Sequence, residues 1–169
     1  MTQLLLSSAS AEQTEEFGRL LGSLLEPGTL IALQGELGGG KTCFVRGVVA
    51  AAAPQSAHLV ASPTFAIMHE YPGHPAVYHF DFYRLHGAGD IIELGFEEYL
   101  QRDGIVLAEW SERLGELLPA DHMTIRFEHA GDTGRTITCE AHGDRHDAVL
   151  HRFSKLAGGS FSLTSPPSK

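Results

Sequence analysis

The stretch GELGGGKT at residues 35–42 decides the fold. It fits the pattern G-x-x-x-x-G-K-[ST] of a phosphate-binding loop. Its glycines allow backbone angles that other residues avoid, so consecutive N–H groups can point at one anion. Lys41 adds a positive charge for the outer phosphates, and the hydroxyl of Thr42 can ligate Mg²⁺. Because glycine-rich runs also occur in ordinary turns, the flanking sequence has to decide between the two interpretations.

The flanks favour a phosphate-binding loop over a chance turn. Residues 29–33 form a short apolar run that follows a Pro27-Gly28 turn, and this pattern indicates a buried strand. Residues 44–52 place apolar side chains at helical spacing up to Pro54. The loop therefore joins a strand to a helix N-terminus, where free N–H groups and the helix dipole favour a phosphate. We interpret residues 35–42 as a nucleotide-binding P-loop.

The remaining pattern predicts an α/β protein. We expect a P-loop NTPase-like three-layer fold, with a mainly parallel central sheet and antiparallel hairpin additions. The predicted elements are a strand at 3–6, a helix at 11–25, a hairpin of 66–68 with 76–83, a helix at 90–100 interrupted by Gly95, a buried strand at 105–108 and a surface hairpin of 123–128 with 135–140. We expect one ATPase domain over residues 1–155 and a disordered tail over residues 156–169.

Composition limits the classes of partner. The formal net charge of −9 argues against a broad electrostatic grip on nucleic acid, and the chain has three lysines, at 41, 155 and 169. The acidic surface serves either protein partners or solubility. Cys43 and Cys139 lack metal-type spacing, and the histidines form no set typical of a zinc site. With neither a signal-peptide pattern nor a membrane-length apolar run, we expect a cytoplasmic protein without membrane contact.

Two acidic residues are candidates for metal binding and hydrolysis. Glu109 follows four apolar residues at a strand end, which is the form of a Walker B site. Asp81 shares one strand face with His79 and Tyr83, although an ordinary edge strand would also show such a polar face. Thr64 lies in a Ser-Pro-Thr loop that could contact Mg²⁺ or the γ-phosphate, or could simply be a turn.

Five motifs in fixed order resemble one known family. GELGGGKT, SPTF at 62–65, HFDFYRL at 79–85, ELGFEEYL at 93–100 and AEWSERL at 108–114 resemble the TsaE (YjeE) family of bacterial ATPases. The similarity covers about residues 10–138. Family members usually carry a second threonine after the P-loop threonine, where this chain has Cys43. That departure touches the outer face of the phosphate site, and we expect little loss of function from it.

The resemblance implies an ATPase that takes part in forming threonylcarbamoyladenosine in tRNA. Its implied cofactors are ATP and Mg²⁺, its implied partners are TsaD-like and TsaB-like proteins, and tRNA is reached only through that complex. The implied catalytic residues are Lys41, Asp81 and Glu109, and the implied metal-binding residues are Thr42, Asp81 and Glu109. The implied nucleotide-binding residues are Gly35, Glu36, Leu37, Gly38, Gly39, Gly40, Lys41, Thr42, Cys43, Thr64 and Trp110. For Trp110, a partly buried core aromatic is the alternative interpretation.

Two other functions stay open on the sequence. One is a small-molecule kinase, which would normally need several arginines in a lid over the phosphates. The other is a nucleotide-gated protein-binding module in which hydrolysis is incidental. No guanine-reading Asn/Thr-Lys-x-Asp motif contains any of the three lysines, so adenine is favoured. We name residues 10–13 and the turn at Gly134-Arg135 as candidate rims of the adenine site. We also expect a low intrinsic rate, because no arginine finger is evident.

Overall fold

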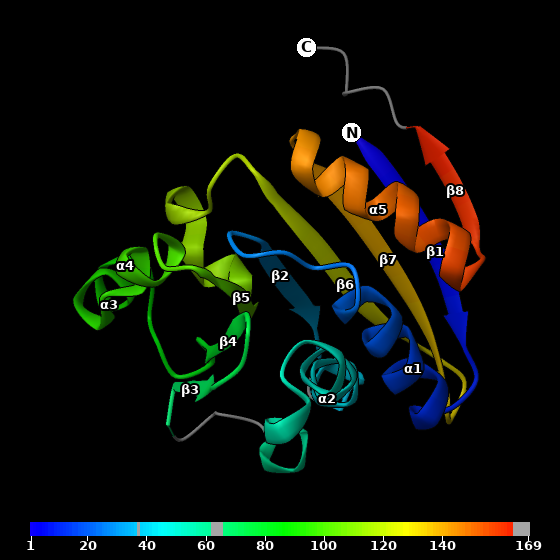
Figure 1. The fold of residues 1–169 in the computed structure, drawn as a ribbon, viewed down its shortest axis with the longest axis horizontal. Helices are drawn as coiled ribbons and strands as arrows, with labels where there is room; N and C mark the ends of the chain where they lie inside the picture. Colours follow the sequence, from blue (N-terminus) through cyan, green and yellow to red (C-terminus); the bar gives the residue numbers. More distant parts are fainter. Residues whose placement is uncertain (37, 62–65, 164–169) are drawn as a thin grey trace.

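One eight-stranded sheet organises the described part of the chain (Figure 1). The structure, a computed structural model, describes residues 1–36, 38–61 and 66–163. The strands are β1 Thr2–Ser8, β2 Leu30–Gly35, β3 Met68–Tyr71, β4 Ala76–Asp81, β5 Gly104–Glu109, β6 His122–Ala130, β7 Gly134–His142 and β8 Ser160–Leu163. The helices are α1 Ala11–Gly22, α2 Lys41–Ala52, α3 Ala88–Leu94, α4 Phe96–Leu100 and α5 Asp144–Ala157, with 3-10 helices η1 Pro54–Leu59 and η2 Ser111–Leu117.

The centre of the sheet is parallel. The strand order is β3-β4-β5-β2-β6-β7-β1-β8. Strands β4, β5, β2 and β6 pair in parallel, whereas β3 on one side and β7, β1 and β8 on the other pair antiparallel. This arrangement confirms the expected α/β class with a parallel centre and antiparallel additions. Among the described residues, no helix has the length and apolar character needed to cross a membrane.

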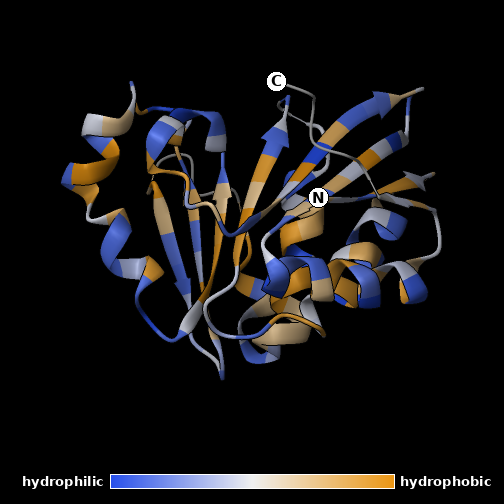
Figure 2. Cartoon of the chain, turned by 90° about the horizontal axis from the view of Figure 1, so that it is seen from above, coloured by the Kyte–Doolittle hydropathy of each residue, from blue (hydrophilic) through white to orange (hydrophobic). Residues whose placement is uncertain are grey.

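Helices cover both faces of the sheet, which makes three layers (Figures 1 and 2). On one face, α1, α2 and α5 bury one large core against alternate residues of the strands, with Ile31 and Leu33 at its centre. On the other face, α3, α4 and η2 bury a smaller, aromatic-rich core around Phe80 and Phe96. Burial on both faces explains why β2 and β5 are continuous apolar runs.

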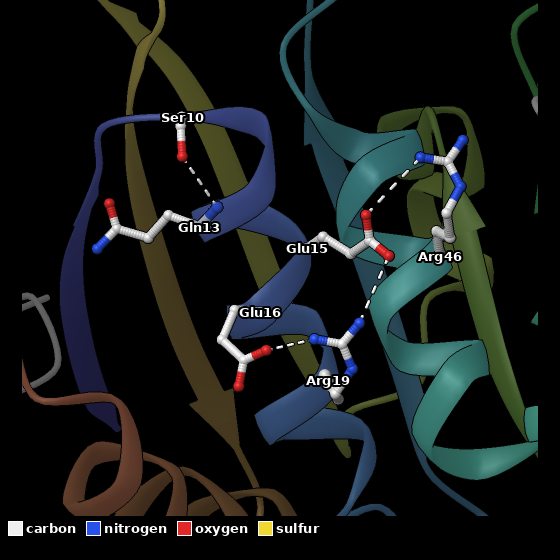
Figure 3. A network of polar contacts seen from close by, with 6 residues as sticks. All are labelled: Ser10, Gln13, Glu15, Glu16, Arg19 and Arg46. Atoms are coloured by element: carbon white, nitrogen blue, oxygen red, sulfur yellow. Dashed lines mark hydrogen bonds and ion pairs between the residues drawn. The ribbon is translucent and has the colours of Figure 1, made fainter.

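The helix that follows the P-loop is held in place by close packing against α1. Gly18 and Gly47 lie at the contact, where an added Cβ at either position would collide with backbone of the other helix. Ion pairs add to this packing at the surface, where Glu15 pairs with Arg19 at 3.6 Å and with Arg46 of α2 at 4.0 Å (Figure 3). The Ser10 side chain caps α1 by accepting from the Gln13 N–H at 3.1 Å. Helix α2 therefore starts at a fixed point beside the sheet.

Several predicted elements differ from the structure, and the strand expected at 66–68 is β3, Met68–Tyr71. Helix α1 ends at Gly22, before residue 25, and the predicted helix at 90–100 is two short helices broken at Gly95, whose φ is 81°. The hairpin of β6 and β7 is not a surface feature. Strand β6 pairs in parallel with β2, and its residues Met123, Ile125 and Phe127 are buried in the larger core. The predicted pairing of β6 with β7 is confirmed, but β6 has β2 as a second neighbour, a strand far away in the sequence.

The expected disorder from residue 156 is wrong for residues 156–163. Residues 156 and 157 end α5, a helix that the sequence analysis did not predict, and Ser160–Leu163 form β8, which pairs with β1. The backbone of β8 covers an edge of the sheet, and this pairing needs no hydrophobic pattern of its own. Residues 164–169, the rest of the expected tail, lie outside the described residues.

Candidate nucleotide-binding site

The P-loop joins the end of β2 to the first turn of α2. Gly40 caps the helix with φ of 102°, and the Phe44 N–H donates to the Gly40 carbonyl at 3.0 Å. Such a positive φ favours glycine, because a side chain there would be strained. The loop is tightened by the Gly39 N–H, which donates to the Glu36 carbonyl at 3.0 Å. The free N–H groups of the first helical turn therefore face the space in front of the loop.

Two carboxylates lie beside this loop because parallel strands end at the same edge of the sheet. Asp81 is the last residue of β4 and Glu109 the last residue of β5, and the two are paired in register. Glu109 also lies opposite Leu33 of β2, two residues before Gly35. Both acids are about 3% exposed. Asp81 Oδ1 accepts from the Tyr83 N–H at 2.9 Å.

Burial and nearby acids have opposite effects on the pKa of the Lys41 ammonium group. Burial lowers the pKa of Lys41, and the negative charges of Glu109, Glu112 and Asp81 act against that effect. Its Nζ donates to the Gly35 carbonyl, and it lies 4.8 Å from the ring centroid of Trp110. Trp110 itself has a φ of 56°, so the chain turns sharply directly after β5. The lysine is thus a buried cation in front of the P-loop.

These groups line one cavity of about 450 Å³. Nine of the expected site residues contribute to its wall: Gly38, Gly39, Gly40, Lys41, Thr42, Cys43, Asp81, Glu109 and Trp110. Gly35 and Glu36 instead line a neighbouring cavity of about 580 Å³, and Trp110 belongs to both. Leu37 and Thr64 lie outside the described residues, so the structure does not place them. Parts of three motifs that are far apart along the chain, GELGGGKT, HFDFYRL and AEWSERL, therefore meet at one cavity.

The far wall of this cavity comes from α1 and from the turn between β6 and β7. Ala11 and Arg135 lie in the segments that we named as candidate adenine rims, whereas Thr14, Asp132 and Thr133 were not predicted. No local motif marks those three residues, because their position depends on how α1 and the turn approach the loop. Arg135 reaches the P-loop directly: its Nε donates to the Gly39 carbonyl at 3.1 Å, and its Nη2 donates to the Gly38 carbonyl at 3.0 Å.

A buried histidine contacts one of the two acids from outside the cavity. His79 is fully buried on β4, and its Nε2 lies 2.6 Å from Oε2 of Glu109. The expectation that His79 shares a strand face with Asp81 is consistent with this contact. Thr42, Asp81 and Glu109 supply hydroxyl and carboxylate oxygens, the hard donors that Mg²⁺ prefers. The donor chemistry at the cavity therefore fits a magnesium ion beside bound phosphates.

Comparisons with known proteins agree on one family. Residues 8–137 match the sequence model of the family described as "Threonylcarbamoyl adenosine biosynthesis protein TsaE". A tRNA threonylcarbamoyladenosine biosynthesis protein TsaE from Bacillus subtilis is 35% identical over 92% of this chain and 96% of its own length. The TsaE protein of Treponema pallidum is 38% identical over 78% of this chain and 96% of its own length.

A solved structure agrees with the sequence comparisons. The crystal structure of Bacillus subtilis YdiB superposes with a TM-score of 0.75 at 30% sequence identity, and covers 92% of this chain and 97% of that one. The chain belongs to the TsaE family, whose members act in the biosynthesis of threonylcarbamoyladenosine in tRNA.

Proposed function

We propose that this chain is a Mg²⁺-dependent ATPase that supports formation of threonylcarbamoyladenosine in tRNA. One observation carries the proposal: a P-loop with a buried lysine opens onto the same cavity as two carboxylates, Asp81 and Glu109, that end adjacent strands. Phosphate-binding N–H groups and acids for a metal or a water are the two parts that nucleotide hydrolysis requires. A cavity that offered phosphate contacts alone would support nucleotide binding without hydrolysis.

The proposed roles follow from position. Lys41 and the N–H groups at the start of α2 bind the outer phosphates. Thr42 and Glu109 would hold the metal, directly or through water, and a bound ion would neutralise charge on the phosphate oxygens. Asp81 orients the attacking water or completes the metal shell. Trp110 lies against the Lys41 ammonium and limits its movement in the cavity.

The partners in this proposal are TsaD-like and TsaB-like proteins, and the chain reaches tRNA through them. The names of the relatives support the pathway. The formal net charge of −9 supports indirect contact with tRNA, because direct binding to a polyanion needs clustered basic residues. ATP binding and hydrolysis then support or reset the transferase complex between turnovers. Tight, salt-sensitive binding of this chain alone to bulk tRNA would contradict this arrangement.

The direct test is ATP hydrolysis by the purified chain, alone and with TsaB and TsaD from the same source. We expect slow turnover by the chain alone and stimulation by the two partners. Glu109→Ala should abolish the stimulation, whereas Glu98→Ala on α4, outside the residues lining the cavity, should retain it. Tight ATP binding without stimulated hydrolysis would favour a nucleotide-gated module, and ADP formation that requires an added metabolite would favour a kinase.

A further inference from the structure

The histidine beneath Glu109 has a role that none of the motifs assigns. We propose that His79 is a positioning residue, whose Nε2–H fixes the Glu109 carboxylate in the orientation that ATP hydrolysis requires. This inference rests on the proposed ATPase function. Its starting observation is the contact of 2.6 Å between His79 Nε2 and Glu109 Oε2, formed between two buried residues.

The position of His79 on β4 lets it contact Glu109 but no ligand in the cavity. His79 lies two residues before Asp81 on β4, so both side chains leave the same face of the sheet. Asp81 lines the cavity, whereas His79 does not. The histidine therefore does not contact a nucleotide in that cavity, and its influence passes through Glu109.

Packing alone does not account for a histidine at this position. The ring stacks on Tyr71, with centroids 6.4 Å apart and an interplanar angle of 30°. Its Nδ1 is buried and has no hydrogen-bond partner among the described residues. A phenylalanine or leucine would fill the space without leaving an unpaired nitrogen, and a buried unpaired polar atom destabilises a fold. The contact that only a nitrogen donor can supply is the one to Glu109.

The bond also selects which oxygen of Glu109 remains free. A carboxylate accepts hydrogen bonds through both oxygens, and His79 occupies Oε2. The terminal torsion of a glutamate is otherwise broad, so a carboxylate without this partner would sample many orientations. With the ring fixed by Tyr71 and the bond in place, Oε1 is left for a metal or a water in the cavity. His79 thus converts a mobile acid into an oriented one.

Two matched substitutions test the role. In His79→Gln the amide N–H can occupy the place of Nε2, whereas in His79→Asn the shorter side chain reaches only to the place of Nδ1. Both variants are neutral and polar, so they disturb the core similarly. With TsaB and TsaD present, we expect kcat for ATP hydrolysis to fall about 10- to 100-fold in His79→Asn and to stay within about threefold of the parent in His79→Gln. The Kd for ATP, measured by calorimetry, should change less than about threefold in both variants.

The outcomes separate this inference from the proposed function. Equal loss of kcat in both variants, or full activity in His79→Asn, would overturn the positioning role while leaving the ATPase intact. A parent chain that hydrolyses no ATP with its partners would overturn the ATPase and this role together.

A second measurement needs neither nucleotide nor hydrolysis. In the ¹⁵N-histidine-labelled full chain, the His79 Nε2 resonance should carry a slowly exchanging proton and should move on Glu109→Gln. The ring of His122, at the start of β6 and outside the cavity lining, is the internal control and should not move. An unchanged His79 resonance would show that the bond to Glu109 is absent and would overturn the inference.

Discussion

The carboxyl ends and the amino ends of the parallel strands form two opposite edges of the sheet, and each buries a different set of polar side chains. At the edge where β2, β4 and β5 finish, Lys41, Asp81 and Glu109 open onto the P-loop cavity. At the other edge, His122 of β6 and His142 of β7 are paired in register with their rings stacked 4.4 Å apart.

The histidine edge is held together by bonds within the chain. His146 of α5 accepts from the Leu30 N–H through its Nε2 at 3.3 Å, and His122 Nδ1 lies 2.7 Å from the Pro119 carbonyl oxygen. These bonds tie α5 and the start of β6 to the fold. At the cavity edge, by contrast, like charges of two acids lie side by side next to a desolvated ammonium group. Such an arrangement is costly without a ligand, so we interpret the cavity shared by the acids and the ammonium group as the binding site.

Replacing Asp81 should give the largest separation of ATP hydrolysis from ATP binding. We expect Asp81→Asn to lower stimulated ATP hydrolysis roughly 100-fold or more, because an amide cannot act as a base or hold the metal as a carboxylate does. ATP affinity measured by calorimetry should stay within about threefold of the parent. Asp90→Asn is the matched control, since that carboxylate bonds the His86 N–H outside the cavity lining. Normal hydrolysis by Asp81→Asn would remove Asp81 from the mechanism.

Replacing Lys41 should affect binding while sparing the fold. Because burial already disfavours its charged form, Lys41→Met should leave the midpoint of thermal unfolding unchanged or higher. The same variant should weaken ATP binding about 10- to 100-fold, which is the usual contribution of a hydrogen bond to a charged group. Lys155→Met, on the exposed face of α5, should change neither quantity. ATP binding at parental affinity by Lys41→Met would contradict the site.

Lowering the pH should destabilise the fold through His146 at the histidine edge. Burial, followed by the charge of His122, lowers the pKa of His146 to about 4 from its usual 6.5. Between these pH values the unfolded chain binds a proton that the folded chain does not, so the free energy of unfolding falls as the pH drops. The slope from this group reaches about 1.4 kcal/mol per pH unit.

Urea unfolding at pH 7 and pH 5 measures this effect. His146→Gln should reduce the difference between the two pH values, whereas His58→Gln, at an exposed position, should leave it unchanged. ATP affinity at pH 7 should be the same in His146→Gln and the parent, because His146 is remote from the cavity lining. Identical pH dependence in His146→Gln and the parent would mean that this edge carries no such proton linkage.

Replacing Arg135 should have the smallest effect on ATP affinity, because its hydrogen bonds go to backbone carbonyls of the P-loop. Arg135→Ala removes two bonds to P-loop carbonyls, and we expect ATP affinity to fall about fivefold. Arg126→Ala is the matched control: that side chain bonds Gln34 and lines the neighbouring cavity. A loss in Arg126→Ala equal to that in Arg135→Ala would indicate a general charge effect instead of a clamp on the loop.

The residues that sequence could identify are those whose chemistry is local. The P-loop is a continuous motif, and Glu109 stands at the end of an apolar run, so the sequence predicts both, and both line the same cavity. Thr14 and Asp132 reach the cavity only through packing between distant segments. Helix α5 did carry a signal, since Val149, Leu150 and Phe153 recur on one buried face, but the charged and polar residues around them in the sequence weaken it. Strand β8 carried little signal, because it has four residues, of which Phe161 packs against the larger core, and it lies in a segment rich in glycine, serine and proline.

The contact between Arg135 and the P-loop has a consequence for how the protein matures during synthesis. The arginine and its two carbonyl partners are separated by 96 and 97 residues in the chain. During translation the glycine loop leaves the ribosome long before the strand that clamps it, and domains fold as units once their distant strands can pair. The P-loop is therefore synthesised early, but the site forms only after β7 has been made and has paired. We expect nascent chains that end before β7 to bind nucleotide poorly, so nucleotide retention would report that the sheet has closed.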